Sequence, residues 1–120
     1  MNYNTKWNIE EMTGYKPLTT FWSDFNIAEA FGVEAIKDTY NRAFNGWRSN
    51  VQYLTELVMV LNWKLWYFYN LATKDETEEA DRTIADTYSR VYNDLWEEAD
   101  LWCGENLKGE DAEYYYRVTD

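Results

Sequence analysis

The longest apolar run of the chain, residues 51–72, limits the fold more than any other feature of the sequence. Its apolar side chains recur at alternating spacings of three and four residues, the period of an α-helix. They are Val51, Leu54, Val58, Leu61, Leu65, Phe68 and Ala72, and a second stripe holds Met59, Trp63, Trp66 and Tyr69. A helix this apolar must be covered on several sides, so we predict a central helix, covered by other helices or by another subunit. Five polar residues interrupt the run and argue against a membrane span: Gln52, Glu56, Asn62, Lys64 and Asn70.

Two shorter helices are predicted before this segment. Ser23 and Asp24 can cap the first, which ends at Gly32 and buries Phe25, Ile27, Ala28 and Phe31. The second starts at Val33, and its apolar stripe is Val33, Ile36, Tyr40, Ala43, Phe44 and Trp47. A break is expected between Gly46 and Asn50, with Ser49-Asn50 as the next N-cap.

One long helix and one short segment are predicted after the central helix. Asp75 and Glu78 resemble a capping box, and the helix that follows runs to about Leu107. Its core stripe is Ala80, Ile84, Tyr88, Val91, Leu95, Ala99 and Trp102, broadened by Ala85, Tyr92, Trp96 and Cys103. Gly109 breaks the pattern, and residues 110–118 are expected to form a short helical segment.

The patterns together predict an all-α fold, a compact bundle of about four helices. A chain of 120 residues is expected to form a single domain, residues 1–120. Residues 1–21 have weak periodicity and are expected to be an irregular arm, with a short helical turn near Ile9–Met12. Trp7, Tyr15 and Leu18 are the expected anchors of this arm to the helical body, residues 22–120.

Negative charge is concentrated in the last two-fifths of the sequence. The chain has a net charge of −11; residues 1–72 hold seven acids and six bases, whereas residues 73–120 hold fifteen acids and five bases. Such a chain is not expected to bind nucleic acid or an anionic membrane directly, because both require basic patches. A basic partner, or solubility alone, explains the charge.

The predicted helix up to Leu107 carries many of these acids opposite its core stripe. Acids four and seven residues apart on one helix lie about 6 and 10 Å apart, comparable with phosphate spacings on nucleic acid. A rigid row of carboxylates can therefore imitate a phosphate backbone, although most charged helix faces are simply solvated. The tyrosines at 114–116 offer additional contact area. The predicted partner-binding residues are Asp86, Asp94, Glu97, Asp100, Glu105, Asp111, Glu113, Tyr114, Tyr115 and Tyr116.

The residues that most enzyme and metal sites use are missing. The chain has no histidine, no glycine-rich phosphate loop and no calcium-binding loop, so we expect no enzyme, metal or cofactor. Neighbouring carboxylates such as Glu97 and Glu98 point to different sides of a helix, which leaves a two-carboxylate hydrolase as a minor alternative. The acids of residues 75–79 fit a helix cap better than a weak divalent-ion site. Cys103 is expected to be a buried thiol, and a single cysteine without a signal peptide indicates a cytoplasmic protein.

Three stretches resemble a group of small acidic proteins found on phages and mobile elements of gut bacteria. They are TELVMVLNWK at residues 55–64, LWEEAD at residues 95–100 and EYYYRVTD at residues 113–120. The resemblance spans roughly residues 18–120, and residues 75–85 are additional length. It carries no catalytic motif. Proteins of this size, charge and setting include anti-CRISPR inhibitors, which often bind the basic nucleic-acid channel of a CRISPR nuclease.

The sequence therefore predicts that the protein is a non-enzymatic inhibitor in the host bacterial cytoplasm. Its acidic C-terminal surface is expected to occupy a basic groove of a nucleic-acid-binding protein, such as a CRISPR nuclease, and to block DNA loading. The alternative is a structural or assembly module of a phage or mobile element that acts through aromatic protein–protein contacts. The sequence leaves the oligomeric state open.

Overall fold

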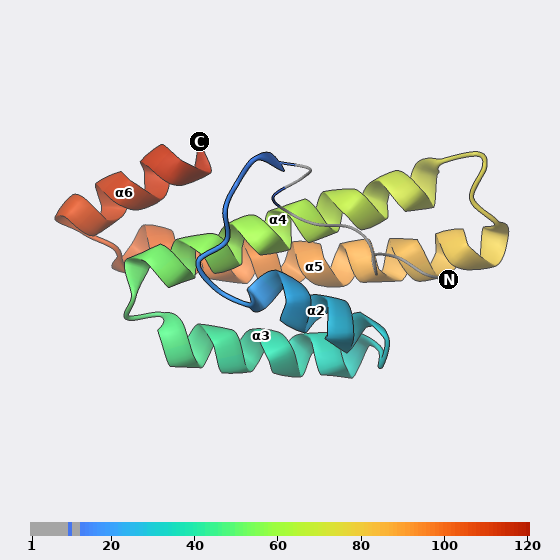
Figure 1. Cartoon of the computed structure of the whole chain (residues 1–120), viewed down its shortest axis with the longest axis horizontal. Helices are drawn as coiled ribbons and strands as arrows, with labels where there is room; N and C mark the ends of the chain where they lie inside the picture. The colour runs from blue at the N-terminus through green and yellow to red at the C-terminus, as the bar shows by residue number, and fades with distance from the viewer. Residues whose placement is uncertain (1–9, 11–12) are drawn as a thin grey trace. The chain divides into compact units, whose positions relative to one another are not determined.

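The computed structural model describes residue 10 and residues 13–120 (Figure 1). All regular secondary structure in this part of the chain is helical, which confirms the all-α class. The helices are α2 (Phe21–Glu29), α3 (Val33–Trp47), α4 (Val51–Thr73), α5 (Glu79–Asn106) and α6 (Gly109–Thr119). The expected anchor Trp7, and most of the expected turn near Ile9–Met12, lie outside the described residues. None of the described helices is both long enough and apolar enough to cross a membrane.

Backbone contacts divide the chain into two compact units, residues 1–57 and 58–120, with the boundary inside α4. The expectation of one domain stays a prediction. The first unit contains α2, α3 and the first turns of α4. The second contains the rest of α4 together with α5 and α6.

Helices α2 and α3 pack side by side in the first unit (Figure 1). Helix α2 begins earlier than predicted: Thr20 is its N-cap residue, without a side-chain cap hydrogen bond, and the Thr20 hydroxyl donates to Asp24 Oδ2 at 3.0 Å. This start places Phe21, Trp22, Phe25 and Ala28 on the buried side. The predicted burial of Ile27 and Phe31 is wrong, since these side chains are 63% and 80% exposed.

The connection from α3 to α4 follows the prediction closely. Helix α3 ends at Trp47, and Asn50 caps α4 by accepting a hydrogen bond from the Tyr53 N–H at 3.1 Å. The rings of Trp47 and Tyr53 meet edge to face across this turn, with centroids 4.8 Å apart. The asparagine cap satisfies one of the free N–H groups that open every helix.

The irregular segment at residues 14–20 is anchored by one buried carboxylate. Glu56 of α4 is fully buried and accepts hydrogen bonds from the Tyr15 hydroxyl at 2.8 Å, the Leu18 N–H at 2.7 Å and the Thr19 N–H at 2.9 Å. It also accepts one from the Thr19 hydroxyl. Tyr15 is thus confirmed as an anchor. Leu18 acts through its backbone, and its side chain is exposed.

The second unit has its core between α5 and the α4 residues from Val58 onward (Figure 1). Phe68 stacks on Tyr92 with ring centroids 5.9 Å apart and meets Tyr88 edge to face at 5.3 Å. The hydroxyl of Ser89 donates to the Leu65 carbonyl at 2.9 Å, which satisfies a buried polar group inside this core.

The start of α5 differs from the prediction. Glu78 is the N-cap residue without a side-chain cap hydrogen bond, so the capping box predicted from Asp75 and Glu78 is wrong. Ala80 and Ile84 are exposed, and the first buried residue of the helix is Ala85. The α4 residues after Phe68 are themselves wholly or partly exposed, so they offer little apolar surface for these first turns.

Helix α6 is a regular helix of 11 residues, longer than the short segment that was expected. It packs on α5, and Tyr115 is its buried residue, with only 1% of its surface exposed.

Candidate functional site

An open cavity of about 600 Å³ lies between α4 and α5 of the second unit. It is called the α4–α5 groove here and is lined by Leu65, Trp66, Tyr69, Asp86, Ser89, Arg90, Asn93 and Asp94. Trp66 and Tyr69 are 52% and 48% exposed, and their rings meet edge to face at 5.4 Å. Two exposed aromatic rings therefore stand beside two exposed carboxylates, Asp86 and Asp94.

A second cavity of about 410 Å³ lies where α6 meets the same two helices. It is called the α6 pocket here and is lined by Val58, Met59, Asn62, Trp63, Trp96, Asp100, Tyr115, Tyr116, Val118, Thr119 and Asp120. Its lining combines indole and phenol rings with the carboxylates of Asp100 and Asp120.

Helical periodicity places both cavities on one side of the α4–α5 pair. The α4 stripe Met59, Asn62, Trp66 and Tyr69 runs from the α6 pocket into the groove at spacings of three and four residues. The α5 residues Asp86, Asn93 and Asp100 are seven apart and also share one side. Asp86 and Asp100 are about 21 Å apart along the helix axis. One acidic and aromatic face thus extends along the pair.

Of the predicted acids of α5, Asp86 and Asp94 line the groove and Asp100 lines the α6 pocket, whereas Glu97 and Glu105 line neither cavity. Asp86, Asp94, Glu97 and Glu105 are exposed, and Asp100 is half-buried. Some of them have partners: Arg90 donates to Asp86 at 2.8 Å, and the Asn93 side chain donates to Glu97 at 3.2 Å. The Asp86–Arg90 pair is exposed, so it holds the two side chains only weakly and leaves Asp86 accessible to another cation.

The predicted residues of α6 fall into three situations. Asp111 and Glu113 are exposed. Tyr116 is also exposed, whereas Tyr114 is half-buried with the Arg117 guanidinium 5.6 Å from its ring centroid. Tyr115 is buried and does not offer the exposed contact area that we expected of it. Its position follows from helix geometry, because neighbouring residues on α6 point about 100° apart and only one of three tyrosines can face α5.

Tyr115 instead orients a carboxylate. Its hydroxyl donates to Asp100 Oδ1 at 2.5 Å. Burial, followed by this hydrogen bond, raises the pKa of Tyr115 well above its usual range, so the phenol keeps its proton and stays the donor. Burial likewise raises the pKa of the nearby Cys103 to about 12. Cys103 is therefore a protonated, buried thiol, as expected, and unsuited to act as a nucleophile.

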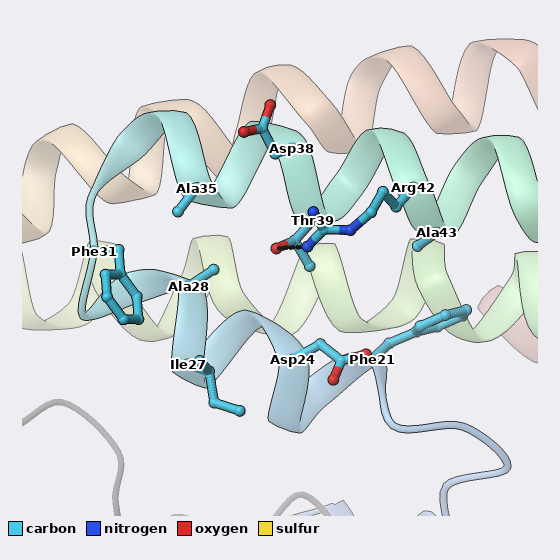
Figure 2. Close-up of a pocket in the computed structure, with 10 residues that line it drawn as sticks. All are labelled: Phe21, Asp24, Ile27, Ala28, Phe31, Ala35, Asp38, Thr39, Arg42 and Ala43. Atoms are coloured by element: carbon cyan, nitrogen blue, oxygen red, sulfur yellow. Dashed lines mark hydrogen bonds between the residues drawn. The ribbon is translucent and has the colours of Figure 1, made fainter.

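The first unit carries a separate cavity of about 380 Å³ between α2 and α3. Figure 2 shows Ala28, Ala35 and Thr39 between the two helices, with Ile27 and Phe31 at the rim. The guanidinium of Arg42 donates to the Thr39 hydroxyl at 3.5 Å, drawn as the dashed line. Ile27 of α2 and Phe31 of the α2–α3 connection line this cavity and are exposed, whereas the sequence analysis placed both side chains in the core.

Nothing in the described part of the chain forms a metal centre. No group of three or more Cys, Asp or Glu residues there is arranged to hold a metal ion. The acids of residues 75–79 lie in the α4–α5 connection and the first residue of α5. Their arrangement offers no chemistry beyond surface charge.

The groove residues Trp66 and Tyr69 were recognised from sequence as a second apolar stripe that another subunit could cover, and they were not among the predicted partner-binding residues. The sequence feature that could have identified them as groove residues is their spacing: two aromatic residues lie three apart on the side of the helix away from the core stripe. Glu56 was counted only as a polar interruption. A carboxylate on a buried helix needs hydrogen-bond partners. The position of Glu56 on the predicted central helix was therefore the sequence signal for an anchor.

Comparison with known proteins adds no assignment: no protein-family model matches the sequence, and neither a curated protein nor a solved structure matches it.

Proposed function

We propose that this protein is a binding inhibitor that places the acidic and aromatic face of α4 and α5 against a basic surface of a nucleic-acid-binding protein. The observation that carries the proposal is the α4–α5 groove, where Trp66 and Tyr69 are exposed beside Asp86 and Asp94. Aromatic rings and carboxylates together suit arginine and lysine side chains, because a cation can lie over a ring and pair with an acid at the same time.

The distribution of charge on α5 supports a basic partner. The helix carries eight acids and two bases, Arg82 and Arg90, over residues 79–106. Asp94, Glu97 and Glu105 project from its exposed side. A long-range attraction from such a helix would speed the encounter with a cationic surface and would weaken as salt is added.

The partner class that we propose is supported by the spacing of the acids and by the sequence resemblance to proteins of mobile elements. Asp86 and Glu97 are eleven residues apart, which corresponds to about 16 Å along the helix axis, a span that several phosphates of one nucleic-acid strand also cover. We infer that the face competes with DNA for a basic channel, as an anti-CRISPR protein does, and that a CRISPR nuclease is the partner.

A binding and cleavage assay with a panel of purified CRISPR nucleases tests this proposal. Each nuclease is loaded with its guide RNA, and its affinity for the protein is measured from 50 to 500 mM NaCl. The expected result is binding to at least one nuclease that weakens steeply with salt and that inhibits DNA cleavage. The proposal would be overturned if the protein bound none of the nucleases, or if its affinity did not change with salt concentration.

Two variants with equal charge locate the contact. The test variant Asp86→Asn/Asp94→Asn/Glu97→Gln removes three acids from the α5 face. The control variant Asp75→Asn/Glu76→Gln/Glu110→Gln removes three exposed acids elsewhere in the second unit. We expect the test variant to lose at least tenfold in affinity and the control to lose less than twofold. Equal losses would show that net charge alone matters.

A second candidate function is an assembly module, favoured by the exposed Phe31 and Ile27 at the α2–α3 cavity (Figure 2). Its occupant would be a second copy of this chain, because apolar rims on identical subunits can cover each other in a symmetric dimer. Analytical ultracentrifugation of the wild type and of Phe31→Ser/Ile27→Ser decides this. A dimeric wild type together with a monomeric variant favours the assembly function. A monomeric wild type excludes it.

A further inference from the structure

The α6 pocket has the chemistry of a binding site for one organic cation. Of the described residues that line it, Asp100 and Asp120 are acidic and none is lysine or arginine. The negative charge of the pocket is therefore not neutralised from within its own lining. At about 410 Å³ the cavity is within the size range of small-molecule sites.

Aromatic rings make up much of the remaining wall. Trp63 of α4, Trp96 of α5 and Tyr116 of α6 are among the residues that line the cavity. The Tyr116 hydroxyl lies close to Gly104, 3.6 Å from where a Cβ atom would be on that glycine, so α6 is held near α5 at this point. Ring faces attract cations, and indole does so most strongly.

Asp100 is fixed in place before any ligand arrives. The Tyr115 hydroxyl donates to its Oδ1 atom, and Tyr115 itself is buried. Because the phenol holds its proton, it is the donor in this bond, and further lone pairs remain available on both Asp100 oxygens. A carboxylate that is already oriented loses little conformational freedom when it pairs with a cation.

We propose that the α6 pocket binds a single guanidinium or alkylammonium group between Asp100 and the rings of Trp63 and Trp96. The group comes either from an arginine or lysine side chain of a protein partner or from a free amine. The pocket is distinct from the α4–α5 groove, and the inference does not depend on the proposed inhibitor function. A small cation can test the pocket in the absence of any nuclease.

Titration of the full-length protein with ethylguanidinium, followed by the indole N–H signals in NMR spectra, is the direct test. N-ethylurea is the matched probe, since it has the same shape without the charge. We expect saturable shifts of the two pocket indoles with a Kd of ~1 mM for the cation, and no saturation with the urea. Equal responses to the two probes, or no saturable response to the cation, would overturn the proposal without any mutation.

Substitutions then assign the charge. Asp100→Asn keeps the shape and an acceptor for Tyr115, and it should weaken ethylguanidinium binding at least tenfold. Glu98→Gln removes an equal charge from an exposed position of the same helix outside the pocket and should leave the Kd within twofold. An unchanged Kd in Asp100→Asn would contradict the assignment, and circular dichroism confirms that both variants are folded.

Two further ligands identify the source of the cation. The capped peptide acetyl-Gly-Arg-Gly-amide represents a partner's side chain, and n-butylammonium represents a free amine. Binding of the peptide points to a protein partner, whereas binding of butylammonium alone points to a small metabolite. If groove variants abolish nuclease inhibition and still bind ethylguanidinium, the two sites are separate. If the wild type inhibits a nuclease but does not bind ethylguanidinium, the pocket proposal is wrong and the proposed inhibitor function stands.

Discussion

Replacing Glu56 tests how strongly the segment at residues 14–20 is held to α4. The carboxylate is fully buried and accepts hydrogen bonds from the Leu18 and Thr19 N–H groups and from the hydroxyls of Tyr15 and Thr19. In Glu56→Gln one oxygen becomes an NH₂ group, which cannot accept, so one backbone N–H loses its partner. Leaving a buried donor unpaired costs about 1–3 kcal/mol, and a bond to a charged acceptor is worth about 1.5–3 kcal/mol.

We therefore expect Glu56→Gln to lower the free energy of unfolding by about 2–3 kcal/mol and Glu56→Ala by about 4 kcal/mol. Urea unfolding followed by tryptophan fluorescence measures the loss. Glu98→Gln is the matched control, because Glu98 is exposed and the same chemical change there should cost less than about 0.5 kcal/mol.

Amide hydrogen exchange provides a local measurement of the same contact. The Leu18 and Thr19 amides should be protected in the wild type and should exchange at least tenfold faster in Glu56→Gln. If Glu56→Gln unfolds at the same urea concentration as Glu98→Gln and both amides exchange at wild-type rates, the reasoning about this anchor is refuted.

Three further predictions concern the thiol and the helix ends. Because burial raises the pKa of Cys103 to about 12 from an ordinary 9.0, a thiolate-directed reagent at pH 8 should react about 10³-fold more slowly with the folded than with the urea-unfolded protein, and equal rates would contradict this. The stability that comes from keeping this thiol protonated is complete below pH 9 and should be lost as pH rises toward 12. Asn50→Ala should lower the free energy of unfolding by about 1 kcal/mol through loss of the α4 cap, whereas Ser49→Ala beside it should have no measurable effect. Gly32→Ala should cost about 1–3 kcal/mol because Gly32 has a φ of 117°, and the helical Gly46→Ala should instead be neutral or stabilising in the same melts.

The sequence predicted the helices most accurately where local chemistry decides them. Asn50 marks the start of α4 because its side chain accepts a hydrogen bond from the backbone N–H of Tyr53, three residues later. The core stripe of α4 through Leu54, Leu61 and Phe68 is buried as predicted, since three-four spacing places these residues on one side. Both features depend on residues close in sequence.

Predictions failed where tertiary contacts choose among equivalent residues. Helix α2 has apolar residues on two sides, and its tertiary packing buries the side with Phe25 and leaves Ile27 exposed. Three consecutive tyrosines give no indication of which one is buried. The buried one is Tyr115, whose hydroxyl donates a hydrogen bond to Asp100, fifteen residues earlier on another helix. The sequence located the acidic face of α5, but the two cavities beside it depend on how α4, α5 and α6 pack.

The acids of α5 do not all stabilise the helix. Acids near a helix N-terminus are favourable, as for Glu79 and Asp81, but acids in the C-terminal half oppose the helix dipole. Asp94 also lies three and four residues before Glu97 and Glu98, and like charges at those spacings cost about 0.2–0.5 kcal/mol per pair. Arg90, four residues before Asp94, offsets part of this repulsion, so Asp94→Asn should stabilise the free protein by about 0.3 kcal/mol while weakening its complex with a basic partner. If instead Asp94→Asn leaves partner binding intact, the repulsion on α5 serves solubility, and the face loses its claim to be the contact surface.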